Sequence, residues 1–164
     1  MPEEKNFKNK KAEQEIYSVE PVIFGEAEAV WKIRNDSKVR KNFHSTEEIT
    51  LEHHKEWFKN QYFRQEDNKC FVLKEGDSVI GYCRFDFKNN KCLVSIAISP
   101  DCQGRGLGRK LLAEGIEALG TKKEIIAEVK KNNEGSVQLF RKCGFSVFNQ
   151  DENLFYFKYT PKKQ

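Results

Sequence analysis

The spacing of apolar residues alternates along the chain between the period of a strand and that of a helix. β-Branched and aromatic residues predict a first strand at 16–24, and apolar runs at 71–74 and 79–87 predict two strands joined by a short polar turn. A fourth strand is expected at 91–98, after a turn formed by two asparagines. These segments predict an antiparallel sheet.

Helical spacing appears twice ahead of these strands. Apolar residues recur at three and four over residues 25–34, and a turn-rich cluster at 34–37 ends this segment. Thr50 is a suitable N-cap for a second helix over 51–61. The two helices are expected to cover one side of the sheet.

The rest of the chain alternates between helix and strand. A helix is predicted at 106–119, a strand at 124–129, a helix at 136–143, and a closing hairpin from 145–149 and 154–159. Antiparallel strands followed by such a segment predict a mixed α/β fold, one sheet with helices on both faces.

Length and composition are those of one globular domain. The chain has 164 residues, of which 38% are hydrophobic and 33% charged. Residues 1–14 are dominated by Lys, Glu and Asn and are expected to form a mobile tail, which leaves 15–164 as the domain. No run is apolar enough for a membrane span or a signal peptide, so we expect a cytoplasmic protein without a membrane partner.

Charge and cysteine usage narrow the function further. The net charge is +4, from 29 basic and 25 acidic residues that are mixed along the chain, whereas a nucleic-acid-binding protein typically has a basic stripe. We therefore expect no nucleic-acid partner. The five cysteines form no Cys-x-x-Cys pair, and the three histidines have no metal-ligand spacing, so we expect reduced thiols and no metal site.

The most informative stretch is Val94 to Leu112, where a strand passes through a glycine-rich turn into a helix. Free N–H groups at a helix start, next to glycines, favour the binding of an anionic phosphate. A Walker loop would end in Gly-Lys-Ser/Thr, and a dinucleotide fingerprint would have its glycines in a different order. Here residues 103–108 read Gln-x-x-Gly-x-Gly instead.

This stretch resembles the signature of the GNAT superfamily of acetyl-CoA-dependent N-acetyltransferases. Residues 126–129 and the run from Asn133 to Phe145 resemble a second GNAT segment, whose asparagine and helix line the pantetheine arm of CoA. The resemblance implies a GNAT fold with a splayed strand pair and acetyl-CoA as the cofactor. The implied cofactor-binding residues are Ile96, Ala97, Ile98, Gln103, Gly104, Arg105, Gly106, Leu107, Gly108, Arg109, Asn133, Ser136 and Phe140. Asn133 is also a suitable helix cap, and Gly144 a suitable left-handed residue at the helix end.

Acetyl transfer to an amine needs a group that takes the ammonium proton. Glu128 aligns with a glutamate that acts as the base in ribosomal-protein N-acetyltransferases of this superfamily, although a solvated or paired strand residue is an equal interpretation. Asp86 is the second catalytic candidate, and His54 is a reserve base. Many members carry a tyrosine where this chain has Phe140, so the leaving thiolate requires another proton donor or none.

The first half of the chain carries three further motifs: Trp31-x-x-Arg34-Asn35-Asp36 with Val39-Arg40, Ile49-Thr50-x-Glu52-x-His54-x-x-Trp57-Phe58, and Gly81-Tyr82-x-Arg84-Phe85-Asp86. They resemble those of GNAT enzymes that acetylate UDP-linked 4-amino-4,6-dideoxy sugars in pseudaminic-acid synthesis. The implied substrate-binding residues are Arg34, Arg40, His54, Trp57 and Arg84. The arginines suit a pyrophosphate, and Trp57, Phe43 and Phe58 suit stacking on uracil or a sugar. Trp31 and Trp57, at helical spacing, are more often core residues. Arg34 and Arg84 are equally consistent with surface ion pairs to Asp36 and Asp86.

Three functions remain open from the sequence. The first is acetyl transfer to the amine of a nucleotide sugar, a small-molecule partner. The second is acetylation of protein N-termini of the ribosomal-protein type, and the third is acyl-CoA binding without catalysis. The oligomeric state is also open, with a homodimer as one option.

Overall fold

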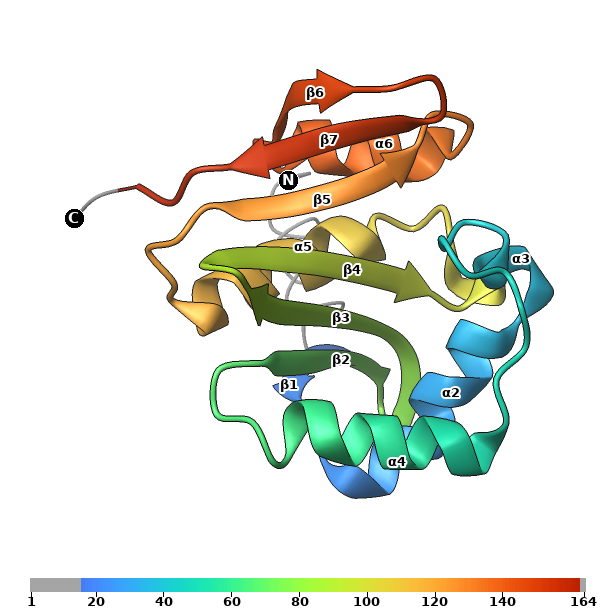
Figure 1. Ribbon diagram of the computed structural model, residues 1–164. Helices are drawn as coiled ribbons and strands as arrows, with labels where there is room; N and C mark the ends of the chain where they lie inside the picture. The colour runs from blue at the N-terminus through green and yellow to red at the C-terminus, as the bar shows by residue number, and fades with distance from the viewer. Residues whose placement is uncertain (1–15, 163–164) are drawn as a thin grey trace, which may run out of the picture.

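The structure is a computed structural model that describes residues 16–162, and its central feature is a seven-stranded sheet (Figure 1). The strands are β1 (Tyr17–Pro21), β2 (Lys69–Glu75), β3 (Ser78–Lys88), β4 (Lys91–Ile98), β5 (Ile125–Lys130), β6 (Ser146–Gln150) and β7 (Leu154–Tyr159). The α-helices are α2 (Ala27–Asn35), α3 (Ser37–Arg40), α4 (Leu51–Tyr62), α5 (Leu107–Leu119) and α6 (Glu134–Lys142), and two 3₁₀ helices are η1 (Phe24–Glu26) and η2 (Pro100–Cys102).

The strand order is β1-β2-β3-β4-β5-β7-β6. Every neighbouring pair is antiparallel except β4 and β5, which run parallel. Helices α5 and α6 lie behind the sheet and α4 lies in front of it, with α2 and α3 beside α4 (Figure 1). We call these two sides the back face and the front face. The predicted mixed sheet with helices on both faces is confirmed.

Each face of the sheet has its own apolar core, because successive side chains of a strand point to opposite sides. On β3, Cys83 and Phe85 point to the back core under α5, whereas Tyr82 points to the front core under α2 and α4. All three side chains are at most 1% exposed. The same alternation places Arg84 and Asp86 on the front face, beside Tyr82.

Several local predictions are confirmed by the backbone. Thr50 caps α4, with its Oγ1 accepting the N–H of His53 at 3.2 Å. Asn89 and Asn90 take positive φ angles of 51° and 65° in the turn before β4, and Gly144 has φ 89° after α6. Within residues 16–162, no helix combines the length and the apolar character that a bilayer crossing requires.

Two element predictions were wrong in extent. The first strand ends at Pro21 instead of continuing to Phe24, which belongs to η1. A proline has no N–H to donate to a sheet, so it is suited to the end of a strand. The cluster expected as a turn at 34–37 contains the start of α3, where Asp36 accepts the N–H of Lys38 at 2.9 Å. The expected tail at 1–14 lies outside the described residues.

Candidate functional site

The two parallel strands at the centre of the sheet separate along their length. β4 and β5 pair only at Cys92–Ile125 and Leu93–Ile126, after which β5 continues its pairing with β7. The N–H of Cys92 donates to Glu124 O on the β5 side at 3.4 Å. Because backbone groups alternate sides along a strand, the N–H groups of Ile96 and Ile98, beyond the last paired residues, face the opening gap. The predicted splay is present.

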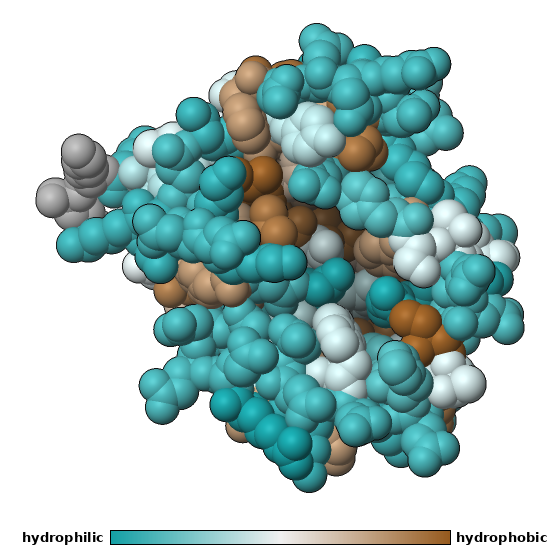
Figure 2. Space-filling model, in the orientation of Figure 1, coloured by the Kyte–Doolittle hydropathy of each residue, from teal (hydrophilic) through white to brown (hydrophobic). Residues whose placement is uncertain are grey.

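A cavity of about 580 Å³ fills this gap and continues to the start of α5. Figure 2 shows the molecule hollowed in the middle of the front face, with apolar residues on the walls of the hollow. We call this cavity the splay cleft. Its lining comes from α3 and the turn after it, the second half of β4, the loop into α5, β5 and α6. Among the residues that line it are Asn42, Phe43, Ser95, Ile96, Ile98, Gly104, Gly106, Arg109, Glu128, Asn133, Ser136 and Phe140.

One end of the splay cleft is made mainly of backbone. Gly104 and Gly106 have φ angles of 81° and 73°, and no atom lies within 4 Å of a Cβ built on either residue. The first intrahelical bond of α5 is Lys110 N–H to Gly106 O at 3.4 Å, so the preceding N–H groups have no partner within the helix. Gln103 closes the loop by donating its Nε2–H to Ile98 O at 3.0 Å. An anionic phosphate therefore has open space and free donors here, which fits the pyrophosphate of CoA.

The first turn of α6 forms another part of the cleft wall. Asn133 caps this helix by accepting the N–H of Ser136 at 3.4 Å, and its Nδ2 donates to the Ser136 hydroxyl at 3.0 Å. A Cβ at Gly108 would lie 3.3 Å from Leu139 Cδ2, so the glycine allows α5 and α6 to approach closely. Phe140 lines the cleft but is only 3% exposed, and its ring packs on Phe145 and Phe157 in the back core.

The other end of the splay cleft carries a carboxylate. Glu128 lies on the front-facing side of β5, and its Oε2 is 2.7 Å from Nε2 of His44. His44 belongs to the loop between α3 and α4. Lys130, two residues further on β5, donates its Nζ–H to Lys41 O at 2.8 Å, which fixes the start of the same loop to β5. The loop therefore bridges the gap between the two halves of the sheet.

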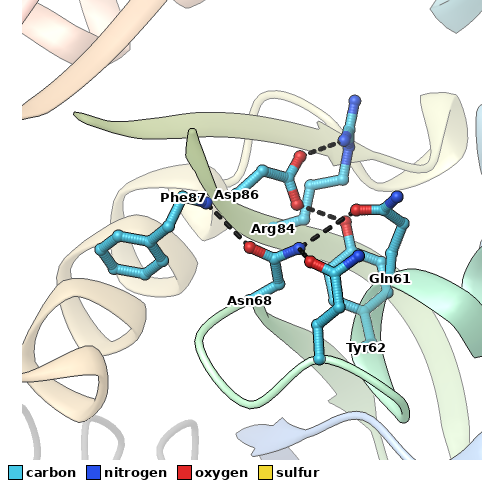
Figure 3. A network of polar contacts seen from close by, with 7 residues as sticks. Gln61, Tyr62, Asn68, Arg84, Asp86 and Phe87 are labelled. Carbon is cyan, nitrogen blue, oxygen red and sulfur yellow. Dashed lines mark hydrogen bonds and ion pairs between the residues drawn. The ribbon is translucent and has the colours of Figure 1, made fainter. Parts of the chain in front are cut away.

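A second polar group lies on the front face beside β4, and Figure 3 shows its hydrogen bonds. Asp86 forms an ion pair with Arg84, and its Oδ1 accepts the hydroxyl of Tyr62 at 2.9 Å. Asn68, 4% exposed, supports this group by accepting the Phe87 N–H at 2.8 Å. Arg84 pairs in register with Ser95 of β4, which lines the splay cleft. The network is thus one strand away from the cleft.

Aromatic rings hold the arginines of this region. Arg84 lies 5.2 Å and Arg34 lies 5.9 Å from the Trp57 ring centroid, and Arg34 is also 5.6 Å from that of Phe43. Burial opposes the charge of Arg84, but Tyr62 and Asp86 outweigh it and raise the pKa of its guanidinium. Burial, together with Arg84, lowers the pKa of Arg34. We call Arg34, Arg84, Trp57, Tyr62 and Asp86 the arginine cluster.

Some buried hydrogen-bond donors of this region lack an acceptor. Among the described residues, the buried Nε atoms of Arg34, Arg84 and Arg40 have no hydrogen-bond partner. A buried donor without a partner is costly, and an anionic ligand or water molecule would satisfy it. Two guanidinium groups against one carboxylate also leave the arginine cluster with excess positive charge.

His54 is placed in the front core. It is 1% exposed and packs between the rings of Trp57 and Phe58 at 5.7 Å and 5.6 Å. Burial lowers the pKa of His54 to about 4, and the cations Arg34 and Arg84 act in the same direction. The imidazole is therefore neutral near pH 7.

The structure brings together most of the residues that the sequence singled out. All the candidate cofactor residues except Arg105 line the splay cleft, and so does the catalytic candidate Glu128. Asp86 and the substrate candidates lie outside the lining. Of these, Arg34, Trp57, Arg84 and Asp86 belong to the arginine cluster. His54 is in the front core, and Arg40 contacts Glu48 at 3.6 Å.

Sequence reasoning missed Asn42 and His44. No local pattern marks them, because they lie in an irregular segment whose contacts to β5 join residues more than 80 positions apart, as in the His44–Glu128 pair with a separation of 84.

The chain belongs to the Acetyltransferase (GNAT) family, whose model matches residues 28–145. This membership confirms the predicted fold and, at the level of the family, an acetyltransferase that uses acetyl-CoA. A curated relative, the uncharacterized protein ML0378 of Mycobacterium leprae, is 31% identical over 86 residues. That match covers 46% of this chain and 23% of the relative, so it spans about a quarter of the relative's length.

Solved structures share the fold at low identity. The candidate acetyltransferase yncA of Salmonella typhimurium, solved with its cofactor acetyl-CoA, has a TM-score of 0.75 at 19% identity, over 91% of this chain and 96% of that one. Spermidine N-acetyltransferase of Vibrio cholerae, in complex with CoA and spermine, has 0.75 at 16%, over 89% and 96%. Ribosomal-protein-alanine N-acetyltransferase of Brucella melitensis has 0.75 at 22%, over 88% and 99%. Proteins with such different acceptors share one fold, so the fold does not identify the acceptor.

Proposed function

We propose that this protein transfers the acetyl group of acetyl-CoA to a primary amine, most specifically the 4-amino group of a UDP-linked amino-dideoxy sugar, by direct attack in a ternary complex. The observation that carries this function is the splay cleft. A single cavity joins a phosphate-sized backbone cradle at α5 to the carboxylate of Glu128 on β5. Donor and acceptor therefore meet in one space.

The donor is held mainly by main-chain groups. The N–H groups at the start of α5 and the open glycine positions 104 and 106 receive the pyrophosphate, and Arg109 adds positive charge beside it. Asn133, Ser136 and Phe140 line the path of the pantetheine arm. When bound, acetyl-CoA supplies an acyl group activated as a thioester.

The free edge of β4 positions and activates the acyl group. The N–H groups of Ile96 and Ile98 face the gap left by β5, so they donate to a carbonyl oxygen placed between the strands. Donors fixed in advance stabilise the negative charge that develops on this oxygen during attack. This task falls to the backbone of β4 and needs no side chain.

Glu128 is the group that removes a proton from the acceptor ammonium. It lines the splay cleft, and its side chain is 39% exposed. Asp86, the other candidate, is neutralised by Arg84, accepts a hydrogen bond from Tyr62 and lies outside the cleft lining. The oxygens of Asp86 are thus occupied and away from the cleft, whereas Glu128 reaches into it, which favours Glu128.

The arginine cluster supports an acceptor that carries an anionic group. Arg34 and Arg84 offer unpartnered Nε donors, and Trp57 and Phe43 offer ring faces. Phe43 lines the splay cleft and contacts Arg34, so the cluster adjoins the acceptor side of the cleft. A UDP pyrophosphate bound by guanidinium groups, with a base or sugar stacked on an aromatic ring, matches these features.

The test is a comparison of acceptors with purified protein. Acetyl-CoA is incubated with UDP-4-amino-4,6-dideoxy sugars, the same sugars without UDP, or N-terminal peptides, and free thiol is followed. We expect thiol release with the UDP-linked sugars, at least tenfold faster than without UDP. Release with peptides alone would contradict the acceptor class, and acetyl-CoA binding without release on every acceptor would contradict the reaction.

Glu128→Gln is expected to lower kcat/KM for the acceptor by about 10² or more, within the usual range for a general base. Glu152→Gln is the matched control, since Glu152 is an exposed residue of the turn between β6 and β7. Equal activity of the two variants would remove Glu128 from the mechanism.

A further inference from the structure

We propose that His44 conducts the acceptor's proton from Glu128 to bulk water, so that the two side chains form a proton exit for acetyl transfer. This inference rests on the proposed function. It adds a residue that no sequence motif marks, and it assigns a role to the loop that bridges the splay.

His44 is the more exposed partner of Glu128. Glu128 lines the splay cleft, whereas His44 does not, and the two side chains meet at 2.7 Å through Glu128 Oε2 and His44 Nε2. The exposed fraction rises from 39% for Glu128 to 62% for His44. A proton taken up on the cleft side of the carboxylate therefore has an imidazole on its outward path.

The position of His44 is set by more than this one contact. The loop that carries it is anchored at its start by the Lys130–Lys41 hydrogen bond at 2.8 Å. At its end, Trp31 Nε1 donates to Ile49 O at 2.6 Å, and the Ile49 N–H donates to Asn35 Oδ1 at 2.9 Å. With both ends held by α2 and β5, the loop keeps His44 over Glu128.

The chemistry favours an imidazole at this place. An acceptor amine arrives as an ammonium, and a glutamate carboxyl ordinarily titrates at about 4.3, far below an amine, whereas an imidazole ordinarily titrates at about 6.5. As the ammonium N–H bond breaks, an O–H bond forms on Glu128. That bond breaks in turn as Nε2 of His44, in the tautomer that carries its proton on Nδ1, accepts the proton. The imidazolium then releases one proton to water. The neutral amine attacks the thioester carbon, and the second nitrogen proton passes to water after the carbon–nitrogen bond forms. The carbon–sulfur bond then breaks, and CoA leaves as the thiolate.

The other charged and titratable groups near the pair do not duplicate this role. Lys130 lies on β5, Tyr156 faces Glu128 in register on β7 and hydrogen bonds to Asp151 at 3.0 Å, and Lys41 and Arg40 lie at the end of α3. An imidazole is the one side-chain type in this set that ordinarily titrates near neutral pH. The proton exit therefore predicts a pH-dependent step that depends on His44.

The experiment is chemical rescue. In His44→Ala, kcat/KM for the acceptor at pH 7 should fall about tenfold or more, with the KM for acetyl-CoA unchanged, since an acid–base group typically contributes a factor of 10² to 10⁴. Added imidazole should raise the kcat/KM of His44→Ala at least threefold, because the vacated position is open to solvent. His53→Ala is the matched control: His53 is an exposed residue of α4, and its loss should change nothing.

The pH profile gives a readout that a purely structural role would not move. The dependence of kcat/KM on pH should be steeper for the wild type than for His44→Ala, because the proton exit adds one proton-transfer group to the acceptor amine. Full activity of His44→Ala, or a loss that imidazole does not restore, would overturn the proton exit.

The outcome separates this inference from the proposed function. No thiol release by the wild-type protein on any amine contradicts the function, and the proton exit with it. Thiol release by the wild type together with full activity of His44→Ala contradicts the proton exit alone. The contact itself has an independent readout: Glu128→Gln should shift the ring ¹⁵N signal of His44 and leave that of His53 unchanged, and an unchanged His44 signal would also overturn the inference.

Discussion

The proposed acetyl-CoA site at the start of α5 and the proposed acceptor site around the arginine cluster are built in different ways. We call them the donor end and the acceptor side. The donor end, at the start of α5, is made of backbone from one continuous stretch, with two glycines at φ 81° and 73°. The acceptor side combines side chains from α2, the loop after α3, α4 and β3, among them Arg34, Trp57 and Arg84. One end presents main-chain N–H groups, and the other presents ionic and aromatic side chains.

The difference has a thermodynamic consequence. A cradle of main-chain N–H groups tolerates changes of side chain, but it depends on the φ angles that its glycines allow. The arginine cluster is partly buried and contributes to the front core, so its members affect folding as well as binding. Substitutions at the two ends should therefore separate: those at the donor end change acetyl-CoA affinity, and those at the acceptor side change stability and acceptor use.

The largest effect on stability is expected for Arg84→Ala. The change leaves Asp86 and Tyr62 without their cation in a site where the Arg84 side chain is only 20% exposed. Removal of one partner of a buried ion pair typically costs 3 to 5 kcal/mol, so we expect a loss of about 3 kcal/mol in urea unfolding. Lys32→Ala, at an exposed ion pair with Glu28, should cost less than about 0.5 kcal/mol.

Acetyl-CoA affinity should stay within about twofold in Arg84→Ala, as measured by calorimetry under folded conditions. Equal stability of Arg84→Ala and Lys32→Ala would contradict a structural role for the arginine cluster. A large loss of acetyl-CoA affinity in Arg84→Ala would contradict separate donor and acceptor sites.

Buried His54 makes the acceptor side sensitive to acid. Its pKa of about 4 in the folded protein lies below the ordinary value of 6.5, so the unfolded chain binds the proton first as the pH falls. This contribution to stability is complete above pH 6.5 and is lost on going down to about pH 4. It amounts to about 2 kcal/mol between pH 6.5 and 4.5.

Urea unfolding of the wild type and His54→Phe at these two pH values measures this contribution. Phenylalanine keeps a ring beside Trp57 and Phe58 but cannot take up a proton. The variant should lose about 2 kcal/mol less than the wild type on acidification, and His53→Phe, at an exposed position, should behave as the wild type. The same loss in all three proteins would contradict a neutral, buried His54.

Two glycines allow a matched test of the donor end. Gly106 precedes α5 with φ 73° and Gly120 follows it with φ 61°, and no atom lies within 4 Å of the position that a Cβ would occupy on either residue. Alanine at either position should cost about 1 kcal/mol of stability, because each holds a left-handed conformation. Gly106→Ala should also weaken acetyl-CoA binding about tenfold by calorimetry, whereas Gly120→Ala should not. Equal affinities would mean that the loop does not bind the donor.

The smallest effect on activity is expected at Phe140. From the resemblance, this is the position at which many GNAT enzymes carry a tyrosine. The ring packs against Phe145 and Phe157 and is 3% exposed. The thiol of CoA, like an ordinary thiol that titrates near about 8.5, is a tolerable leaving group as a thiolate. Phe140→Tyr should change kcat by less than about threefold in the thiol-release assay, and an increase above tenfold would show that protonation of the thiolate limits the wild type.

The donor end could be predicted from sequence because its information is local. Residues 91–98 form a strand with the bounds expected, and the glycine turn and the helix after it lie where the pattern indicated. Strand period, glycine positions and helix capping each depend on a few neighbouring residues, and Asn133 illustrates this in α6 as well.

The acceptor side could be predicted only in part, because its contacts are long-range. Charge and aromatic character singled out Arg34, Trp57 and Arg84, and the structure brings them together. Nothing in the local sequence showed that Asp86 would be bound by Tyr62, or that His44 would reach Glu128 across a separation of 84 residues. Such contacts follow from the sheet order and the path of the loop, which no periodicity encodes.

The most direct test of the account is an amide NMR titration of the protein with acetyl-CoA. Binding in the splay cleft through main-chain groups predicts shifts concentrated at Ile96, Ile98 and residues 103–109, with smaller shifts at the start of α6. The amides of Arg84 and Asn68 should stay unchanged until a UDP-linked amino sugar is added. Shifts centred on the arginine cluster with acetyl-CoA alone, or no shifts at saturating acetyl-CoA, would contradict the account.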